Sequence, residues 1–138
     1  MIYMEWNSIN KKDDIDKLMN VFGNFHDSCI KEVHYISGAY VNKDLEMNAI
    51  NKRRNVTVVF QRQESNPSTI EVIFEKISKL NLAPVDERYD CVILDAFMDI
   101  FDGEIYWADS KNFDIHDIRE YDDFTWICAE SIRWRSIS

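Results

Sequence analysis

The chain has 138 residues, 46% of them hydrophobic and 13% aromatic, which is enough to bury the core of a single domain spanning 1–138. Its formal net charge of −9 disfavours nucleic acid and anionic membranes as partners. It starts without a signal-peptide pattern, contains no apolar run of membrane-spanning length and has three cysteines without metal-binding spacing, so we expect a cytoplasmic protein with reduced thiols.

A helix is predicted near the start of the chain. Its apolar side chains recur at the spacing of one helix face, namely Ile15, Leu18, Met19 and Phe22. Asp13 and Asp14 fall in the first turn, where they suit the positive end of the helix dipole, and Gly23 can adopt the left-handed conformation that ends a helix. We therefore expect one amphipathic helix packed on the core.

The next segment, FHDSCIKEVHY (25–35), gathers residue types that bind metals. If 28–41 is a strand, His26 and His34 lie about 26 Å apart at about 3.3 Å per residue, which is too far to share an ion. His26 and Asp27 remain as candidate metal ligands, against a turn at the start of the strand in which Asp27 or Ser28 accepts hydrogen bonds from the local backbone. We expect the turn, with no metal and no other cofactor.

Two segments rich in β-branched and aromatic residues follow, 55–63 and 68–77, and ESNPS between them is typical of a turn. They predict a hairpin. Its core face would carry the alternate side chains Val56, Val58, Phe60, Ile70, Val72 and Phe74. The stretches 41–54 and 79–88 are predicted to be connections with short local structure.

A second hairpin is predicted around Asp102-Gly103, a favoured two-residue turn. Pairing 101 with 104 places Ile100 opposite Ile105. One face is then core, with Val92, Leu94, Ala96, Met98, Ile100, Ile105 and Trp107. The other face is acidic and aromatic, with Asp95, Phe97, Asp99, Phe101, Glu104 and Tyr106.

The end of the chain predicts one more strand. Residues 111–123 fit either a helical turn or an acidic loop, in which Asp114 and His116 form a second candidate metal pair. From 124 onward, apolar residues alternate on a predicted core face that Glu130 interrupts: Phe124, Trp126, Cys128, Ile132 and Trp134. Arg133 and Arg135, on the other face, are expected to pair with acids across the sheet.

The order of these elements indicates the fold class. One helix is followed by about six strands with no helices between them, which favours antiparallel pairing. With three glycines and two prolines, a small barrel with tight corners is less favoured than an open sheet. We expect an α+β fold in which the N-terminal helix packs on a curved, mainly antiparallel sheet.

Acids concentrate in one region of the sequence. Residues 86–123 hold thirteen acids and three bases, a net of −10, and the remaining residues hold twelve acids and thirteen bases, a net of +1. Such a field attracts a basic protein, and the alternative is that it only keeps the surface solvated. The candidate partner contacts are Asp95, Phe97, Asp99, Phe101 and Tyr106, and no catalytic residues are predicted.

The segment FHDSCIKEVHY, the later run VTVVFQRQ and the closing TWICAESIRW resemble small bacterial proteins of the toxin-immunity type, in which a short helix and an FHD-like start precede a β-rich body. Phe25, His26 and Asp27 carry the motif. The resemblance implies a non-catalytic inhibitor of a basic toxin. Two other hypotheses stay open: a small-ligand-binding protein or enzyme with a pocket on the concave side of the sheet, and a homo-oligomer in which Phe97 and Phe101 meet across a symmetric interface.

Overall fold

A computed structural model describes residues 5–120 and 122–138. In chain order the elements of these residues are β1 (Asn7–Ile9), α1 (Lys12–Val21), the 3-10 turn η1 (Gly23–Phe25), β2 (Ser28–Ile36), β3 (Tyr40–Val41), β4 (Met47–Asn48), β5 (Asn55–Arg62), β6 (Thr69–Asn81), β7 (Phe97–Phe101), β8 (Glu104–Ala108), the 3-10 helix η2 (Ile115–Glu120) and β9 (Trp126–Ser136). Tyr121, in the segment 111–123 for which either a helical turn or an acidic loop was expected, lies outside the described residues.

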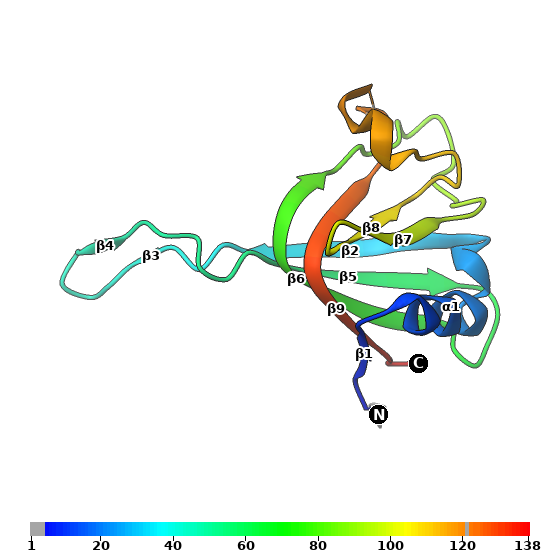
Figure 1. Cartoon of the computed structure of the whole chain (residues 1–138), viewed down its shortest axis with the longest axis horizontal. Helices are drawn as coiled ribbons and strands as arrows, with labels where there is room; N and C mark the ends of the chain where they lie inside the picture. Colours follow the sequence, from blue (N-terminus) through cyan, green and yellow to red (C-terminus); the bar gives the residue numbers. More distant parts are fainter. Residues whose placement is uncertain (1–4, 121) are drawn as a thin grey trace.

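The main sheet has the strand order β2-β5-β6-β9-β8-β7, with β1 added against β9, and each of these pairs is antiparallel. The α+β class and the mainly antiparallel pairing are confirmed, with seven strands in this sheet where about six were predicted. Helix α1 lies against one side of the sheet (Figure 1). Within the described residues, no helix is long and apolar enough to cross a membrane.

The main core lies where α1 and η1 meet the sheet. Ile15, Leu18 and Phe22 are fully buried, as the helical spacing predicted. The rings of Phe25 and Phe60 pack edge-on with centroids 4.8 Å apart, a geometry that aromatic pairs favour. The predicted hairpin of β5 and β6 forms, and its six alternate side chains are buried in this core, namely Val56, Val58, Phe60, Ile70, Val72 and Phe74.

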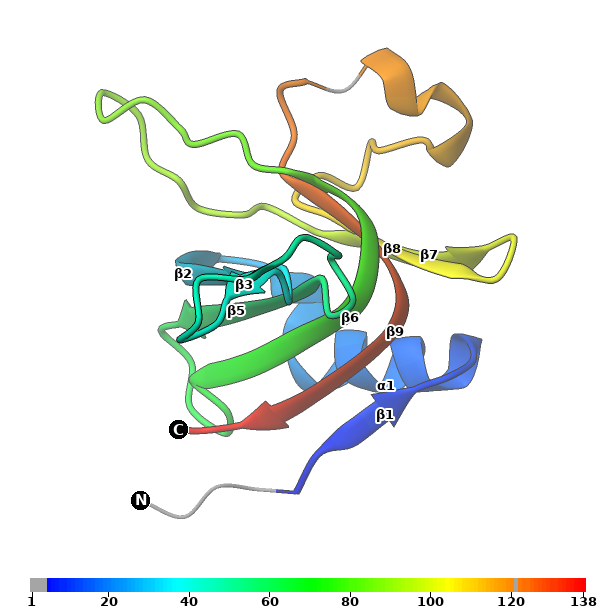
Figure 2. The same ribbon diagram turned by 90° about the vertical axis from the view of Figure 1, so that its left-hand side faces the viewer.

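Strands β6 and β9 change the face that they present to the core halfway along. Phe74 opposes Ile132 in the main core, and three residues further on Ile77 opposes Ala129, again in the main core. Residues three apart in a regular strand point to opposite faces, so the alternation breaks between them. Lys76, at the break, has a φ of 51°. The ribbons of β6 and β9 are both bent (Figure 2).

This break overturns one prediction about β9. Trp126 and Cys128 do not share a face with Ile132 and Trp134, because the alternation restarts at Glu130. They belong instead to a second apolar cluster on the other side of the sheet: Tyr106, Ala108, Phe113, Trp126 and Cys128, with Phe97, Ile115 and Phe124 packed against it. Of the two structures that the sequence allowed for 111–123, the segment that covers this cluster contains the helical turn, η2, which follows Phe113.

The hairpin of β7 and β8 has the predicted register. Ile100 pairs with Ile105 and Met98 with Trp107, and Met98 and Trp107 are buried. The prediction is wrong before Ala96: Val92 is 44% exposed and Leu94 is 72% exposed. The strand begins only at Phe97, so the earlier residues follow a loop rather than a strand's alternation.

The connection between β2 and β5 is a projecting hairpin. Strands β3 and β4 pair through two residues each and form a separate small sheet. In Figure 1 this hairpin extends away from the body of the protein. We call residues 37–54 the arm.

Candidate functional site

The two acids singled out from the sequence reach solvent. The Asp95 side chain is 35% exposed and the Asp99 side chain is 45% exposed. An Asp99 oxygen lies 3.6 Å from Lys12 Nζ, and an Asp95 oxygen lies 3.6 Å from His26 Nδ1. Both carboxylates are therefore accessible to a partner, each with one cationic or titratable neighbour from the N-terminal part of the chain.

Tyr106 is not available to a partner, contrary to the sequence-based hypothesis. It is 8% exposed and packs in the second cluster with Phe113 and Trp126. Burial raises the pKa of its hydroxyl well above the usual value, and a contact with Cys128 adds to this. Phe97 is half-buried, with its ring centroid 5.4 Å from that of Phe113. The segment after β8 folds over this face and covers it.

Phe101 remains the exposed aromatic residue of the predicted set. It is 45% exposed at the end of β7, where it meets the ring of His116 from η2. The centroids are 5.1 Å apart and the planes are nearly perpendicular, at 86°. This contact brings the hairpin tip and the acidic segment around η2 to one place on the surface.

The first metal candidate is an ion-pair cluster. His26 Nε2 lies 3.3 Å from an Asp27 oxygen, and His26 Nδ1 contacts the Leu94 carbonyl. The pKa of His26 is raised by that carbonyl first, and by the charges of Asp27 and Asp95. In residues 5–120 and 122–138, no group of three or more His, Cys, Asp or Glu side chains is arranged to hold a metal ion.

The second metal candidate is part of a turn. An Asp114 carboxylate oxygen accepts a hydrogen bond from the His116 backbone N–H at 2.9 Å. Aspartate commonly bonds to the backbone two residues on in this way. The pair therefore shapes the loop before η2, and the His116 ring packs on Phe101 instead of facing Asp114 as a second ligand.

The prediction that Arg133 and Arg135 each pair with an acid across the sheet is confirmed. Arg133 lies 3.4 Å from Glu75 and Arg135 lies 3.2 Å from Glu71, both across the β6–β9 ladder. Both guanidinium groups also lie over the ring of Trp6, at 4.8 and 4.2 Å from its centroid. Since acids already accompany these cations, the patch does not have the free positive charge of a nucleic-acid platform.

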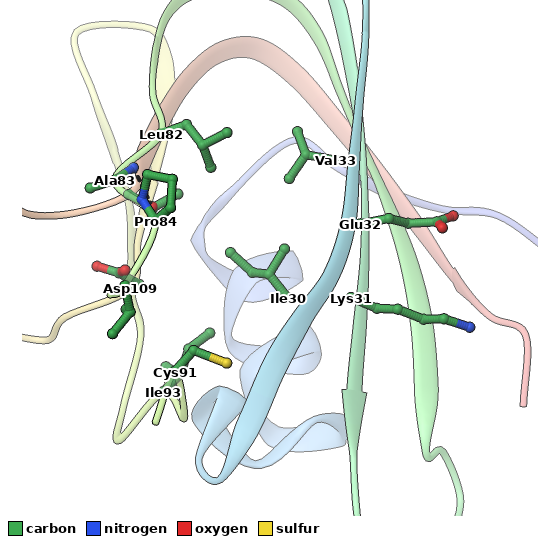
Figure 3. A pocket seen from close by; sticks show the side chains of 12 residues that line it. Ile30, Lys31, Glu32, Val33, Leu82, Ala83, Pro84, Cys91, Ile93 and Asp109 are labelled. Atoms are coloured by element: carbon green, nitrogen blue, oxygen red, sulfur yellow. Dashed lines mark hydrogen bonds between the residues drawn. The ribbon is translucent and has the colours of Figure 1, made fainter. Parts of the chain in front are cut away.

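A groove runs beside the outer edge of β2 (Figure 3). In the described residues, β2 is the terminal strand of the sheet, and the loop after β6 touches its edge through one bridge between Ser28 and Ile93. The space that remains, about 410 Å³, has Ile30 and Val33 on one wall and Leu82 on the other. Further residues at its rim and floor are Lys31, Glu32, Ala83, Pro84, Val85, Cys91, Ile93, Asp109 and Thr125.

The arm is the surface that the sequence analysis missed. It exposes five large apolar side chains: Tyr40, Val41, Leu45, Met47 and Ile50. Leu45 and Met47 are 85% and 73% exposed. The Asn42 side chain closes the turn around them by accepting hydrogen bonds from the backbone of Asp44 and Glu46. Apolar residues at short intervals in an otherwise polar connection were the signal.

Comparisons of the chain with protein-family models, with curated proteins and with solved structures find no match.

Proposed function

We propose that the protein is a non-catalytic binding protein that recognises a basic protein partner through residues 86–123. The observation that carries this proposal is the exposure of the acids in that region. Among the acids of this region whose burial the structure describes, eight are exposed: Asp86, Glu87, Asp90, Asp102, Asp114, Asp117, Asp122 and Asp123. With a net charge of −10 for the region, their field accelerates encounter with a cationic surface and repels anionic ones.

Phe101 supplies the apolar anchor that an acidic surface alone lacks. Binding energy concentrates in a few desolvated aromatic or Arg contacts, and charges around them mainly govern association rate and specificity. Phe101 has its exposed ring beside His116 and follows Asp99 by two residues. A partner that covers this ring also brings its own cations within reach of Asp99 and Asp102.

The specific form of the proposal is an immunity-like role in the cytoplasm. An acidic protein that covers the basic surface of a toxin blocks the approach of an anionic substrate such as nucleic acid. The resemblance of residues 25–35 to toxin-immunity proteins supports this form, and the exposed acids give it a physical basis. The role requires no catalytic residue in the chain.

A small-ligand site is the second candidate function, and the groove beside β2 is the observation that favours it. Its volume of about 410 Å³ is within the range of small-molecule sites. The sequence-based form of this candidate placed the pocket on the concave side of a curved sheet, and we propose that curvature from the bends of β6 and β9. The walls of the groove are mainly apolar, and the side chains of Lys31 and Glu32 extend away from it (Figure 3). Polar groups that would orient a ligand are therefore few.

Affinity capture with a charge-matched control tests the leading proposal. The immobilised chain is exposed to an extract of the cells that encode it, in parallel with an Asp95→Asn/Asp99→Asn variant, and bound proteins are identified by mass spectrometry. We expect a strongly basic protein on the native chain and about tenfold less of it on the variant, corresponding to about 1.4 kcal/mol for two surface charges.

The control variant is Asp44→Asn/Glu46→Gln, which removes the same charge from the exposed tip of the arm. It should capture as much partner as the native chain. Recovery of acidic proteins or small molecules alone, or equal capture by all three proteins, would reject recognition through residues 86–123.

A further inference from the structure

The apolar side chains of the arm are exposed to solvent and are not covered by the other residues that the structure describes. Its two strands pair through Tyr40 with Asn48 and Val41 with Met47, and both strands are exposed along their length. A two-stranded hairpin is at best marginally stable in water unless another surface covers it. Exposed apolar patches of this kind mark interaction sites on soluble proteins.

The base of the arm is nevertheless fixed to the body. The Ser37 carbonyl accepts hydrogen bonds from the backbone N–H groups of Arg53 and Arg54, at 3.1 and 3.0 Å. Gly38 has a φ of 94°, and a Cβ atom there would lie 2.8 Å from the Arg53 nitrogen, so only glycine fits this crossing. The Arg54 guanidinium donates to the Ile77 carbonyl of β6 at 3.0 Å. These contacts fix the base of the arm before any partner binds, which lowers the entropic cost of docking.

The groove beside β2 has the complementary properties. It is mainly apolar, it is open to solvent, and it follows the same strand from which the arm departs. Val33 and Leu82 face each other across it (Figure 3). An apolar hairpin laid along the groove would cover Ile30, Val33 and Leu82 and would bury its own exposed side chains in turn.

We propose that the arm of one copy of the chain docks in the β2 groove of a second copy, and that the second arm docks reciprocally in the first groove. The pairing does not depend on the proposed recognition of a basic partner.

The lengths of arm and groove agree with a two-fold axis beside Ile36. Val33 and Ile30 lie three and six residues before Ile36, about 10 to 20 Å away at about 3.3 Å per residue. Tyr40 and Leu45 lie four and nine residues after it, which allows a reach of up to about 13 to 30 Å. A two-fold rotation at this point places β2 of the second copy antiparallel to β2 of the first. The arm of each copy then lies along the groove of the other, and the two contacts close the dimer.

Charge favours a second copy as the occupant. The loop that forms the outer wall of the groove is acidic, because it exposes Asp86, Glu87 and Asp90. The arm holds four bases, Lys43, Lys52, Arg53 and Arg54, and two acids, Asp44 and Glu46, which gives it a net charge of +2. Reciprocal docking therefore brings an arm of net positive charge toward the negatively charged loop of the other copy.

Multi-angle light scattering on the full chain tests the dimer. We expect the native chain to have twice its mass of 16.4 kDa and the Leu45→Asp/Met47→Asp variant to have the single mass. Leu94→Asp is the control, because Leu94 is 72% exposed on the body and lies outside the groove and the arm; it should stay dimeric. A native chain of single mass at every soluble concentration, or a double arm variant that remains a dimer, would overturn the proposal.

A thiol cross-link tests where the arm docks. Cys91 is an exposed thiol that lines the groove. It lies in the loop whose Ile93 bridges Ser28, and Ser28 is eight residues before Ile36. A Leu45→Cys variant oxidised with oxidised glutathione should form a disulfide between position 45 of one copy and Cys91 of the other, seen as a dimer on non-reducing gels. The dimer band should disappear when Cys91→Ser is added. A Leu45→Cys chain that is dimeric in solution but forms no such link would place the arm elsewhere and contradict the groove.

Discussion

The ring of Phe101 stands edge-on to the ring of His116, with centroids 5.1 Å apart, and this contact joins the tip of the β7–β8 hairpin to the segment around η2. The acids around Phe101 and the acids around His116, more than ten residues apart in the sequence, are thereby brought together beside one exposed aromatic ring. The proposed binding surface depends on this junction, because it places an anchor among the charges.

Replacing Phe101 by alanine should weaken capture of the basic partner by about tenfold or more, since a central aromatic contact typically contributes above about 1.4 kcal/mol to binding. Because Phe101 is 45% exposed, the free energy of unfolding should fall by less than about 1 kcal/mol. Titration calorimetry and urea unfolding measure the two effects. Unchanged affinity together with a large loss of stability would assign Phe101 to folding and not to binding.

Replacing Phe60 by alanine should lower the free energy of unfolding by about 3–5 kcal/mol, because the side chain is fully buried between Phe25 and Trp107. Urea denaturation followed by tryptophan fluorescence measures it. Phe101→Ala is the matched control for the loss of an aromatic ring from the surface. Similar small losses for both variants would contradict the packing described for the core.

His26 should titrate above the usual histidine pKa of 6.5 in the folded protein. The Leu94 carbonyl and the Asp27 and Asp95 carboxylates favour its charged form, so its contribution to stability is present below the unfolded pKa and is lost as pH rises through the raised folded pKa. NMR titration of the ring protons measures the shift, with the urea-unfolded chain as the reference. Asp95→Asn should remove part of the shift and leave the part due to the Leu94 carbonyl; a folded value at or below the unfolded one would contradict the cluster.

The three thiols should differ in reactivity. Cys91 is exposed and should react with a disulfide reagent first, and half-buried Cys29 should react more slowly. Cys128 is 2% exposed and burial raises its pKa, which reduces its thiolate fraction, so it should react only on unfolding. Counting the thiols released over time, with a Cys91→Ser control, checks this order. Early reaction of Cys128 would contradict the burial of the second cluster.

Local patterns predicted the parts of the fold that local interactions determine. The turn at Asp102-Gly103 has the backbone freedom that a tight hairpin needs, and the pairing of Ile100 with Ile105 followed from it. The face of α1 that carries Ile15 and Leu18 followed from helical spacing. In both cases the decisive contacts lie within a few residues of each other.

The parts that were wrong depend on contacts between distant segments. The alternation of β8 places Tyr106 on the face opposite the main core, which predicts an exposed side chain. The later segment with Phe113 and Phe124 covers this face and buries Tyr106. The change of face at Glu130 in β9 is matched by a break at Lys76 in β6, which periodicity in either strand alone does not show. The same limit hid the arm, because a paired but uncovered hairpin gives the sequence pattern of a connection.

The salt dependence of partner binding tests the central claim most directly. With the captured protein purified, its affinity is measured by calorimetry at increasing ionic strength for the native chain and for Asp95→Asn/Asp99→Asn. Recognition through exposed acids predicts that the affinity of the native chain falls steeply as salt screens the charges, and that the variant binds more weakly with a shallower dependence. Equal affinities that do not change with salt would contradict it.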